Sequence, residues 1–163
     1  ADTKVRAEKS IQEFGGNFVI ARVALVMCLP VLGEGNSFVS RMAHGLREGK
    51  QVTTPAAEVR TPVDVITLGR ALLELAAHEY RGIVHLSGND RLNRHEMMQR
   101  IAKRLGLPQE LVVAQDPSGI PGRAPRPRDV SLDNTRAKGV LKTPMVGLDD
   151  GLELVLAAVK GKV

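Results

Sequence analysis

The sequence predicts an α/β protein built around a mostly parallel sheet. Residues 18–26 are almost continuously apolar and β-branched, which is typical of a strand covered on both faces. Residues 82–88 form a second, shorter strand-like segment between glycines. Stretches with helical spacing precede and follow both segments, so helix and buried strand alternate along the chain. Such alternation favours an α/β architecture with parallel strands.

The first half of the chain is expected to run helix, strand, loop and helix, over residues 3–14, 18–26, 28–36 and 37–48. Glycines end both helices, with Gly15 after the first and Gly49 after the second. Ser37 stands where the second helix begins. Residues 51–58 are predicted to be a polar connection.

In the second half, Thr67 is the expected N-cap of a helix that follows residues 59–65. Asn93, with Glu96 three residues on, predicts a capping box for a helix that ends at Gly106. Asp149 is the expected cap of the last helix. The remaining predicted segments are strands at 82–88 and 111–114, a long irregular stretch at 116–129 and a short helix at 134–138.

Composition narrows the class of ligand. The chain has 163 residues, 43% hydrophobic and 25% charged, as in ordinary globular domains. Its three Phe and one Tyr offer little for stacking on bases, so we expect no nucleic-acid partner. The net charge of +5 is spread along the chain, which favours local anion sites. A phosphate-bearing small molecule fits this pattern better than DNA.

Cys28 is the single cysteine, so an internal disulfide is excluded and a reducing, cytoplasmic location is expected. Its apolar surroundings favour a buried, inert thiol over a nucleophile. The longest apolar run, residues 23–32, is too short to span a bilayer, and no membrane association is predicted. The four histidines have no ligand-like spacing, and His95-Glu96 lacks a second histidine, so no metal site is expected.

The chain opens with Ala1-Asp2-Thr3-Lys4, followed one turn on by Ala7-Glu8. This segment resembles the Tyr-x-x-x-Lys motif of the short-chain dehydrogenase/reductase superfamily, with Lys4 as the lysine and the tyrosine one residue before Ala1. Residues four apart share a helix face, so the ammonium would lie beside the phenol and lower its pKa. The resemblance implies that the tyrosine protonates a carbonyl oxygen while a nicotinamide delivers hydride.

The glycine-rich turn of a dinucleotide-binding domain is missing. Nothing in the sequence matches Gly-x-Gly-x-x-Gly or Gly-x-x-Gly-x-x-Gly, and Gly33-x-Gly35 lacks the third glycine. The chain therefore lacks the module that would hold NADP or NAD. We expect the isolated chain to be inactive and its partner to be a missing N-terminal half of the same protein.

Further segments resemble the extended branch of this superfamily, in the family's order. Residues 21–26 are similar to its strand that carries an arginine and leads into a Val-Tyr-Gly-Pro turn, although Cys28 stands in place of the glycine. That replacement puts the backbone approach to the nicotinamide in doubt. Asn36 and Phe38 belong to a segment that resembles the Asn-Phe-Val opening of a substrate-lobe helix in dTDP-dehydrorhamnose reductases. An ordinary capped helix is the alternative.

Two arginines stand in segments that resemble phosphate-binding motifs. Residues 59–65 are similar to the Arg-Asp-x-x-x-Val segment of nucleotide-sugar epimerases, and Thr67 stands where that family has a capping Asp. Residues 126–133 resemble Arg-Pro-x-x-Ser-x-Leu-Asp of the dehydrorhamnose reductases. Guanidinium groups bind diphosphates bidentately, so Arg60 and Arg126 are the predicted ligands of a substrate diphosphate. A basic surface loop is the alternative for the second segment.

Together these motifs resemble the C-terminal half of an extended short-chain dehydrogenase/reductase. The resemblance implies a parent enzyme that reduces the keto group of a nucleotide-diphosphate sugar with NADP or NAD as cofactor, and Lys4 would contact the nicotinamide ribose. A nucleotide-sugar epimerase or dehydratase, and a non-catalytic regulatory relative that only binds nucleotides, stay open as alternatives.

The resemblance also implies a division of the chain. Residues 1–32 and 61–88 would be the remnant of a Rossmann-like, NAD(P)-binding domain, and residues 33–60 and 89–163 a smaller α/β substrate-binding lobe. Without its first half, the sheet would have an unpaired edge and exposed apolar surface. A homo-oligomer stays open.

Overall fold

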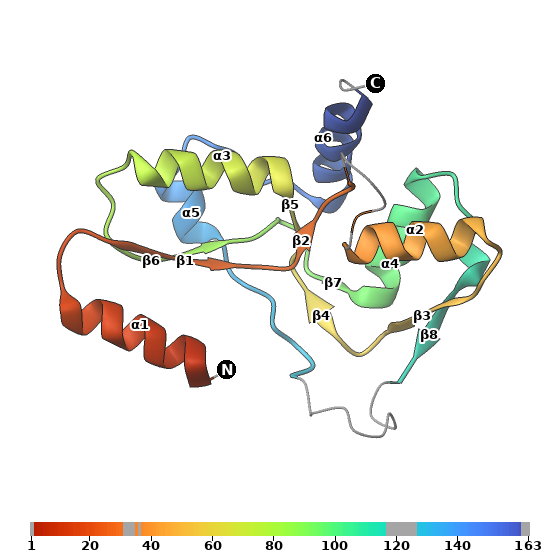
Figure 1. Ribbon diagram of the computed structural model, residues 1–163, viewed down its shortest axis with the longest axis horizontal. Coiled ribbons are helices and arrows are strands. Elements are labelled where there is room, and N and C mark those ends of the chain that lie inside the picture. The colour runs from red at the N-terminus through yellow and green to blue at the C-terminus, as the bar shows by residue number, and fades with distance from the viewer. Residues whose placement is uncertain (1, 31–34, 36, 117–126, 161–163) are drawn as a thin grey trace.

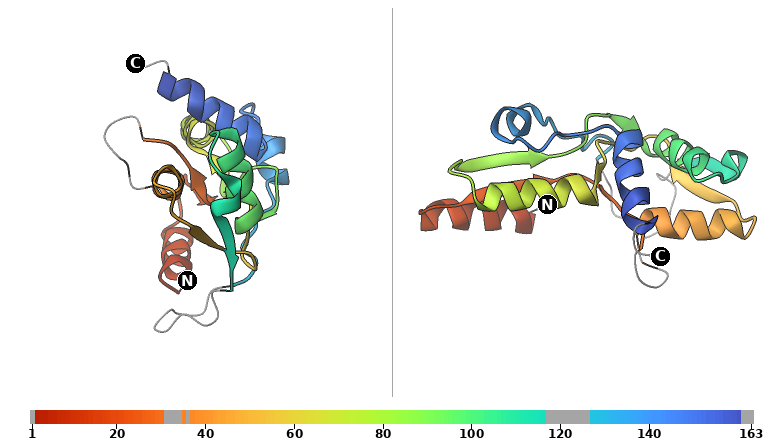
Figure 2. Two further views of the ribbon diagram at one scale, coloured as in Figure 1. Left: turned by 90° about the vertical axis from the view of Figure 1, so that its right-hand side faces the viewer. Right: turned by 90° about the horizontal axis from the view of Figure 1, so that it is seen from above.

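The computed structural model describes residues 2–30, 35, 37–116 and 127–160. Two groups of strands and helices lie side by side, and the last helix, α6 (Leu148–Lys160), stands between them (Figures 1 and 2). Of the four strand pairs in the described residues, three are parallel and one is antiparallel. The predicted α/β class with parallel pairing is confirmed.

The first group is built on β1 (Val19–Val23) and β6 (Gly82–Leu86), which pair in parallel from Val19↔Gly82 to Val23↔Leu86. One strand over 18–26 was expected, and this is wrong. The chain breaks at residues 24–25 and continues as β2 (Val26–Met27), parallel to β5 (Val63–Asp64). The break occurs because the Ala24 amide still binds Leu86, whereas the Leu25 carbonyl already accepts from Val63.

Helices lie on both faces of this first group. Helix α3 (Val65–Ala76) and the short α5 (Thr135–Val140) pack on one face, where Ala71, Val84 and Leu86 are fully buried. Helix α1 (Asp2–Phe14) lies on the other face and runs opposite to β1 (Figure 1).

The N-cap of α3 differs from the prediction. Asp64 is the cap, and its Oδ1 accepts from the amides of Ile66 and Thr67 at 3.0 and 2.8 Å. Thr67 is a buried residue of the first turn. Both Asp and Thr side chains have an oxygen that can accept from helix amides. The prediction of an oxygen-bearing cap was therefore right, but the position of the cap was wrong.

The second group consists of α2 (Phe38–Arg47), β3 (Val52–Pro55), β4 (Val59–Arg60), β7 (Leu92–Asn93), α4 (Arg94–Arg104), the 3-10 turn η1 (Gln109–Leu111) and β8 (Val112–Gln115). Strand β3 pairs with β8 in parallel and β4 with β7 antiparallel. The polar connection expected at 51–58 is thus wrong in part. Thr54 is buried in β3, where its hydroxyl binds Nδ1 of His95 at 3.1 Å.

The predicted helix ends in this group are confirmed. Asn93 accepts from the Glu96 amide at 2.8 Å and caps α4, and Ser37 accepts from the Ser40 amide at 3.0 Å and caps α2. Gly49 and Gly106 follow these helices with φ angles of 71° and 66°, the left-handed region that favours glycine.

Helix α6 joins the two groups. Leu148 and Leu152 are fully buried in one core with Met97 and Ile101 of α4, and α6 also packs against α3 and β5. Its predicted cap is wrong, because Asp90 accepts from the Leu148 amide at 3.0 Å and Asp149 lies inside the first turn. The aspartate that caps the helix comes from a distant segment, which no local pattern reveals.

Strand pairing follows the expected division of the chain. Within the described residues, strands of 1–32 and 61–88 pair with one another, as do strands of 33–60 and 89–163. Helix packing does not follow this division, since α5 packs on β6 and α6 packs on β5. The boundaries therefore stay a prediction.

Part of the first group is uncovered. In the described residues, β1 pairs only with β6, so its other edge has no strand. Helix α1 buries none of its residues, and Phe14 at its end is 93% exposed. On the opposite face, Leu73 of α3 is 76% exposed. An open strand edge flanked by exposed apolar side chains is a feature that proteins usually cover.

Candidate active site

Helix spacing puts Lys4 on the same face of α1 as Glu8, the residue that contacts the sheet, and Lys4 itself is exposed. One turn further along the same helix face, Glu8 accepts two hydrogen bonds from Arg22 of β1, from Nε at 2.9 Å and Nη2 at 2.6 Å. Because α1 runs opposite to β1, its first turn lies toward the carboxyl ends of the strands (Figure 1). In parallel sheets, ligands bind at that edge. The Lys4 ammonium has no hydrogen-bond or ion-pair partner among the described residues.

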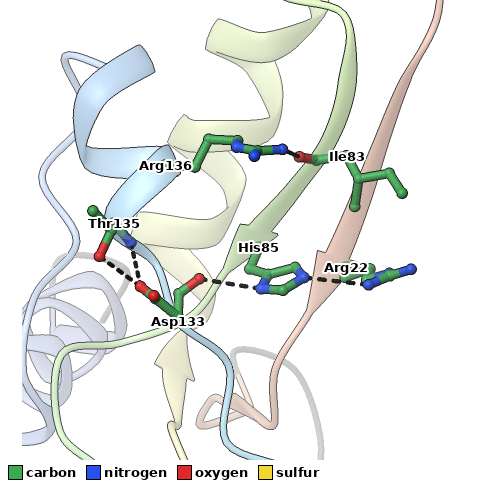
Figure 3. Close-up of a pocket in the computed structure, with 6 residues that line it drawn as sticks. All are labelled: Arg22, Ile83, His85, Asp133, Thr135 and Arg136. Atoms are coloured by element: carbon green, nitrogen blue, oxygen red, sulfur yellow. Dashed lines mark hydrogen bonds between the residues drawn. The ribbon is translucent and has the colours of Figure 1, made fainter.

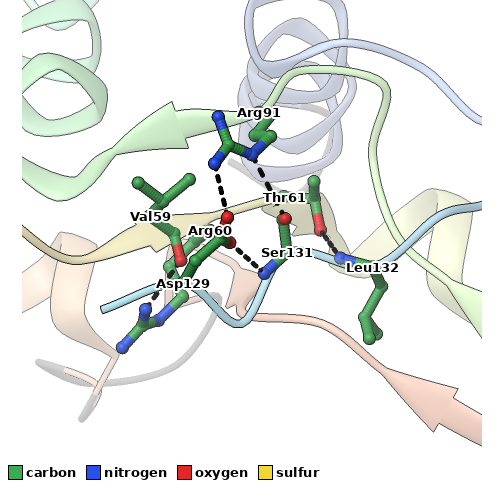
Figure 4. Close-up of polar contacts among 7 residues, drawn as sticks. All are labelled: Val59, Arg60, Thr61, Arg91, Asp129, Ser131 and Leu132. Atoms are coloured by element: carbon green, nitrogen blue, oxygen red, sulfur yellow. Dashed lines mark hydrogen bonds and ion pairs between the residues drawn. The ribbon is translucent and has the colours of Figure 1, made fainter. Parts of the chain in front are cut away.

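The two segments with the predicted phosphate arginines lie side by side. The Val59 amide donates to the Arg128 carbonyl at 2.6 Å, and the Val130 amide donates to the Val59 carbonyl at 3.3 Å. Val59 therefore forms a parallel bridge with Asp129 (Figure 4). Arg126 lies outside the described residues, two positions before Arg128. The structure thus brings the chain next to it against β4, which carries Arg60.

The guanidinium of Arg60 is held within the protein. Its Nη2 binds Glu58 Oε2 at 2.8 Å and its Nη1 binds the Val59 carbonyl at 2.7 Å. The Arg60 side chain is 12% exposed and that of Glu58 only 3%. A buried carboxylate is stable only when paired, so Glu58 fixes the direction in which Arg60 points.

Phe38 belongs to the same neighbourhood. Its ring lies 5.8 Å from the guanidinium of Arg94, and Arg94 Nη1 lies 3.9 Å from Glu58 Oε2. The contact places a cation over an aromatic face, which is favourable. Phe38 and Arg60 are thus connected through Glu58 and Arg94, two residues that the sequence reasoning missed. Arg60 and Arg94 thus share the Glu58 carboxylate. Asn36 lies outside the described residues.

A second polar network fixes the segment that follows Arg126. Arg91 binds the Asp129 carboxylate and donates to Ser131 Oγ at 3.3 Å, and the Ser131 amide donates to Asp129 Oδ1 at 2.9 Å (Figure 4). These contacts hold the pKa of Asp129 well below its usual range, with the bond from Arg91 as the main cause. The Leu132 amide donates to Thr61 Oγ1 at 3.0 Å, which ties the segment to the turn after β4.

The segment borders a cleft of about 280 Å³. Gly88, Asn89 and Asn134 form part of its wall, and Asn134 Nδ2 donates to the Ser87 and Gly88 carbonyls at 2.9 and 3.2 Å. A Cβ on Gly88 would lie 2.0 Å from the Pro62 carbonyl oxygen, so this crossing admits only glycine.

A larger hollow of about 580 Å³ is lined by residues of β1 and β6 and by the start of α5 with the segment before it (Figure 3). Arg22, His85 and Arg136 line it, but its cations are already engaged. Arg22 binds Glu8, and Arg136 donates to the Ile83 carbonyl at 3.1 Å. We therefore do not place the substrate there.

Neither a metal centre nor a membrane helix is found in the part of the chain that the structure describes. No group of three or more His, Cys, Asp or Glu side chains is placed to hold an ion there. No helix of that part is long and apolar enough to cross a membrane.

A comparison with known protein families identifies the family of this chain. Residues 1–160 match the family described as RmlD substrate binding domain. The chain belongs to the RmlD substrate-binding-domain family. The predicted resemblance to the dehydrorhamnose reductases within the extended short-chain reductases is thereby confirmed. A comparison with curated proteins gave no match.

Solved structures agree with the RmlD family at the level of fold. The dTDP-4-dehydrorhamnose reductase of Bacillus anthracis, in complex with NADP, superposes with a TM-score of 0.83 at 20% identity, over 96% of this chain and 54% of that chain. A hypothetical dTDP-4-dehydrorhamnose reductase from Sulfolobus tokodaii is 31% identical, with a TM-score of 0.69 over 84% and 47%. UDP-glucose 4-epimerase of Thermotoga maritima superposes with a TM-score of 0.70 at 22% identity, over 98% of this chain and 51% of that chain. The chain spans about half the length of these proteins.

Proposed function

We propose that this chain is the C-terminal half of an NAD(P)-dependent reductase that acts on a keto sugar linked to a nucleotide diphosphate. The position of Lys4 carries the proposal. Its ammonium is unpaired among the described residues, and it lies on the helix face that Arg22 holds toward the sheet. Membership of the RmlD substrate-binding-domain family supports the same conclusion.

Lys4 has two roles in this proposal. A tyrosine one residue before Ala1 would lie one turn away on the same face, where the ammonium lowers the pKa of the phenol. The tyrosine can then give its proton to the carbonyl oxygen of the sugar. Lys4 also donates hydrogen bonds to the ribose of the nicotinamide cofactor, and NADPH or NADH supplies the hydride when bound.

Arg60 and Arg126 hold the diphosphate of the substrate. Arg60 binds Glu58 and the Val59 carbonyl, its other N–H groups have no hydrogen-bond partner among the described residues, and Glu58 keeps the guanidinium in one orientation. The Arg91–Asp129–Ser131 network holds the chain that follows Arg126 against β4. Phe38, at the start of α2, and Asn36, which lies outside the described residues, contribute to the same lobe in this proposal. We add Arg94 to this substrate-binding group, because it adjoins both Phe38 and Glu58.

The N-terminal half of the same protein is the proposed partner. The open edge of β1 and the uncovered residues of α1 are the surface that another strand and helix would cover. Such a half would also supply the glycine-rich turn for the cofactor's pyrophosphate, which this sequence lacks. From here on, the full-length protein means this chain together with that half.

Cofactor balance tests the function. The full-length protein is mixed with NADPH or NADH and a dTDP-linked or UDP-linked 4-keto sugar, and cofactor oxidation and sugar product are measured together. A reductase oxidises one cofactor for each sugar alcohol formed. Sugar conversion without net cofactor oxidation would replace this proposal with an epimerase or dehydratase. Nucleotide binding without conversion would leave the non-catalytic relative.

A further inference from the structure

Helix α1 is attached to the rest of the chain in an unusual way. It has no buried residue, so apolar packing does not hold it against the described part of the sheet. Within the described residues, the side-chain hydrogen bonds that join α1 to a strand are the two that Arg22 donates to Glu8. Both oxygens of the carboxylate are engaged by one planar guanidinium, which fixes direction as well as distance.

His85 holds Arg22 from the other side. Arg22 and His85 are register partners in the parallel pair of β1 and β6, so their side chains lie on the same face of the sheet. Arg22 Nη1 lies 3.5 Å from His85 Nε2, and His85 Nδ1 lies 3.1 Å from the Asp133 carbonyl oxygen (Figure 3).

The donors and acceptors settle the tautomer of His85. A guanidinium can only donate and a carbonyl oxygen can only accept, so Nε2 must be the acceptor and Nδ1 must carry the hydrogen. The His85 ring therefore donates to the Asp133 carbonyl through Nδ1 and accepts from Arg22 through Nε2, and in this way it helps to orient Arg22. Asp133 in turn follows the segment that Arg91 and Thr61 fix beside the proposed substrate-binding arginines.

The pair is ionised at neutral pH. The hydrogen bond from Arg22 lowers the pKa of Glu8, and the bond to Glu8 raises the pKa of Arg22. The bond is thus present under the conditions in which the proposed reaction runs.

We propose that Arg22 is a positioning residue: by holding Glu8 it sets the rotation of α1 about its axis, and with it the place of Lys4 one turn away. This inference rests on the proposed function for the role of Lys4. Arg22 touches neither substrate nor cofactor in this account. Its effect on turnover passes through Lys4 alone, which separates it from a residue that merely stabilises the fold.

The test uses Arg22→Gln and Glu8→Gln in the full-length protein. Arg6→Gln is the matched control, because Arg6 is on the same helix and forms an exposed ion pair with Asp2 at 3.4 Å. The first readout is hydrogen exchange of the α1 amides, which needs no activity. We expect faster exchange in α1 for both test variants and no change for the control. Unchanged exchange in Arg22→Gln overturns the inference, whether or not the protein is a reductase.

The second readout is turnover. Arg22→Gln is expected to lower kcat about tenfold with little change in the KM of the sugar nucleotide, in the range found for coupled neighbouring residues. Arg22→Lys should restore part of it. In a Lys4→Met background, Arg22→Gln should cause no further loss. An equal loss in both backgrounds would show that Arg22 acts on the fold and not through Lys4, and would overturn the inference.

Discussion

Gly88→Ala should destabilise the protein strongly, because the added methyl group meets backbone on two sides. An ideal Cβ at this position lies 2.0 Å from the Pro62 carbonyl oxygen and 3.1 Å from that of Val146. Neither atom belongs to a side chain that can rotate away. Overpacking a tight site costs about 1–3 kcal/mol, and we expect about 3 kcal/mol here because the strand ends themselves must move.

The displacement also breaks polar contacts. Asn134 Nδ2 donates to the carbonyls of Ser87 and Gly88, and a shift of this turn leaves a buried amide short of partners. The assay is equilibrium urea unfolding of the full-length protein. Gly139→Ala is the control, since Gly139 lies in α5 with nothing within 4 Å of its Cβ position. The control should be stabilised by about 0.5–1 kcal/mol. An unfolding midpoint for Gly88→Ala equal to that of the unchanged protein would refute the packing described for this crossing.

Three further outcomes are expected. Lys4→Met should remove most turnover and raise the pKa of the catalytic phenol, so the midpoint of the pH–rate profile moves to higher pH in either direction of the reaction; an unchanged profile would contradict the role of Lys4. Arg60→Ala and Arg126→Ala should each weaken nucleotide-sugar binding by about 1.5–3 kcal/mol in calorimetry and leave cofactor affinity unchanged. A loss for Arg128→Ala in place of Arg126→Ala would show that the wrong arginine of the segment was chosen. The isolated 163-residue chain should not bind NADPH in a fluorescence titration, and micromolar binding would show that the glycine-rich half is not required.

The sequence predicted correctly those features that depend on residues close together in the chain. Gly15, Gly49 and Gly106 end helices as expected, and Asn93 caps α4 through a side chain three residues from its donor. Strands β1 and β6 were found because their sequences are largely apolar and β-branched. These features depend on neighbouring residues in the sequence, which a single chain displays.

The failures share a different cause, since each depends on a distant partner. The break after β1 follows from amides that bind Leu86 and Leu25, and the cap of α6 is Asp90, far away in the sequence. Strand β3 was not predicted because its one buried side chain is the polar Thr54, whose hydroxyl binds His95. All three features depend on hydrogen bonds between residues that are far apart in the sequence.

The candidate site shows the same division. Lys4, Phe38 and Arg60 were predicted from their resemblance to family motifs, whereas the residues that contact Phe38 and Arg60 were not predicted. Glu58 is an ordinary surface-type residue by sequence, and only the fold buries it between Arg60 and Arg94. These groups come together from strand and helix ends that are 34 residues apart in the chain, from Arg60 to Arg94.

The central claim is that Lys4 faces a nicotinamide cofactor across the carboxyl ends of the strands. A crystal structure of the full-length protein with NADPH bound tests it most directly. The account predicts that Lys4 Nζ lies about 3 Å from a hydroxyl of the nicotinamide ribose, within hydrogen-bond distance, and that Arg22 still binds Glu8 on the same side of α1. A cofactor bound with Lys4 turned into solvent, or α1 rotated so that Glu8 leaves Arg22, would contradict it.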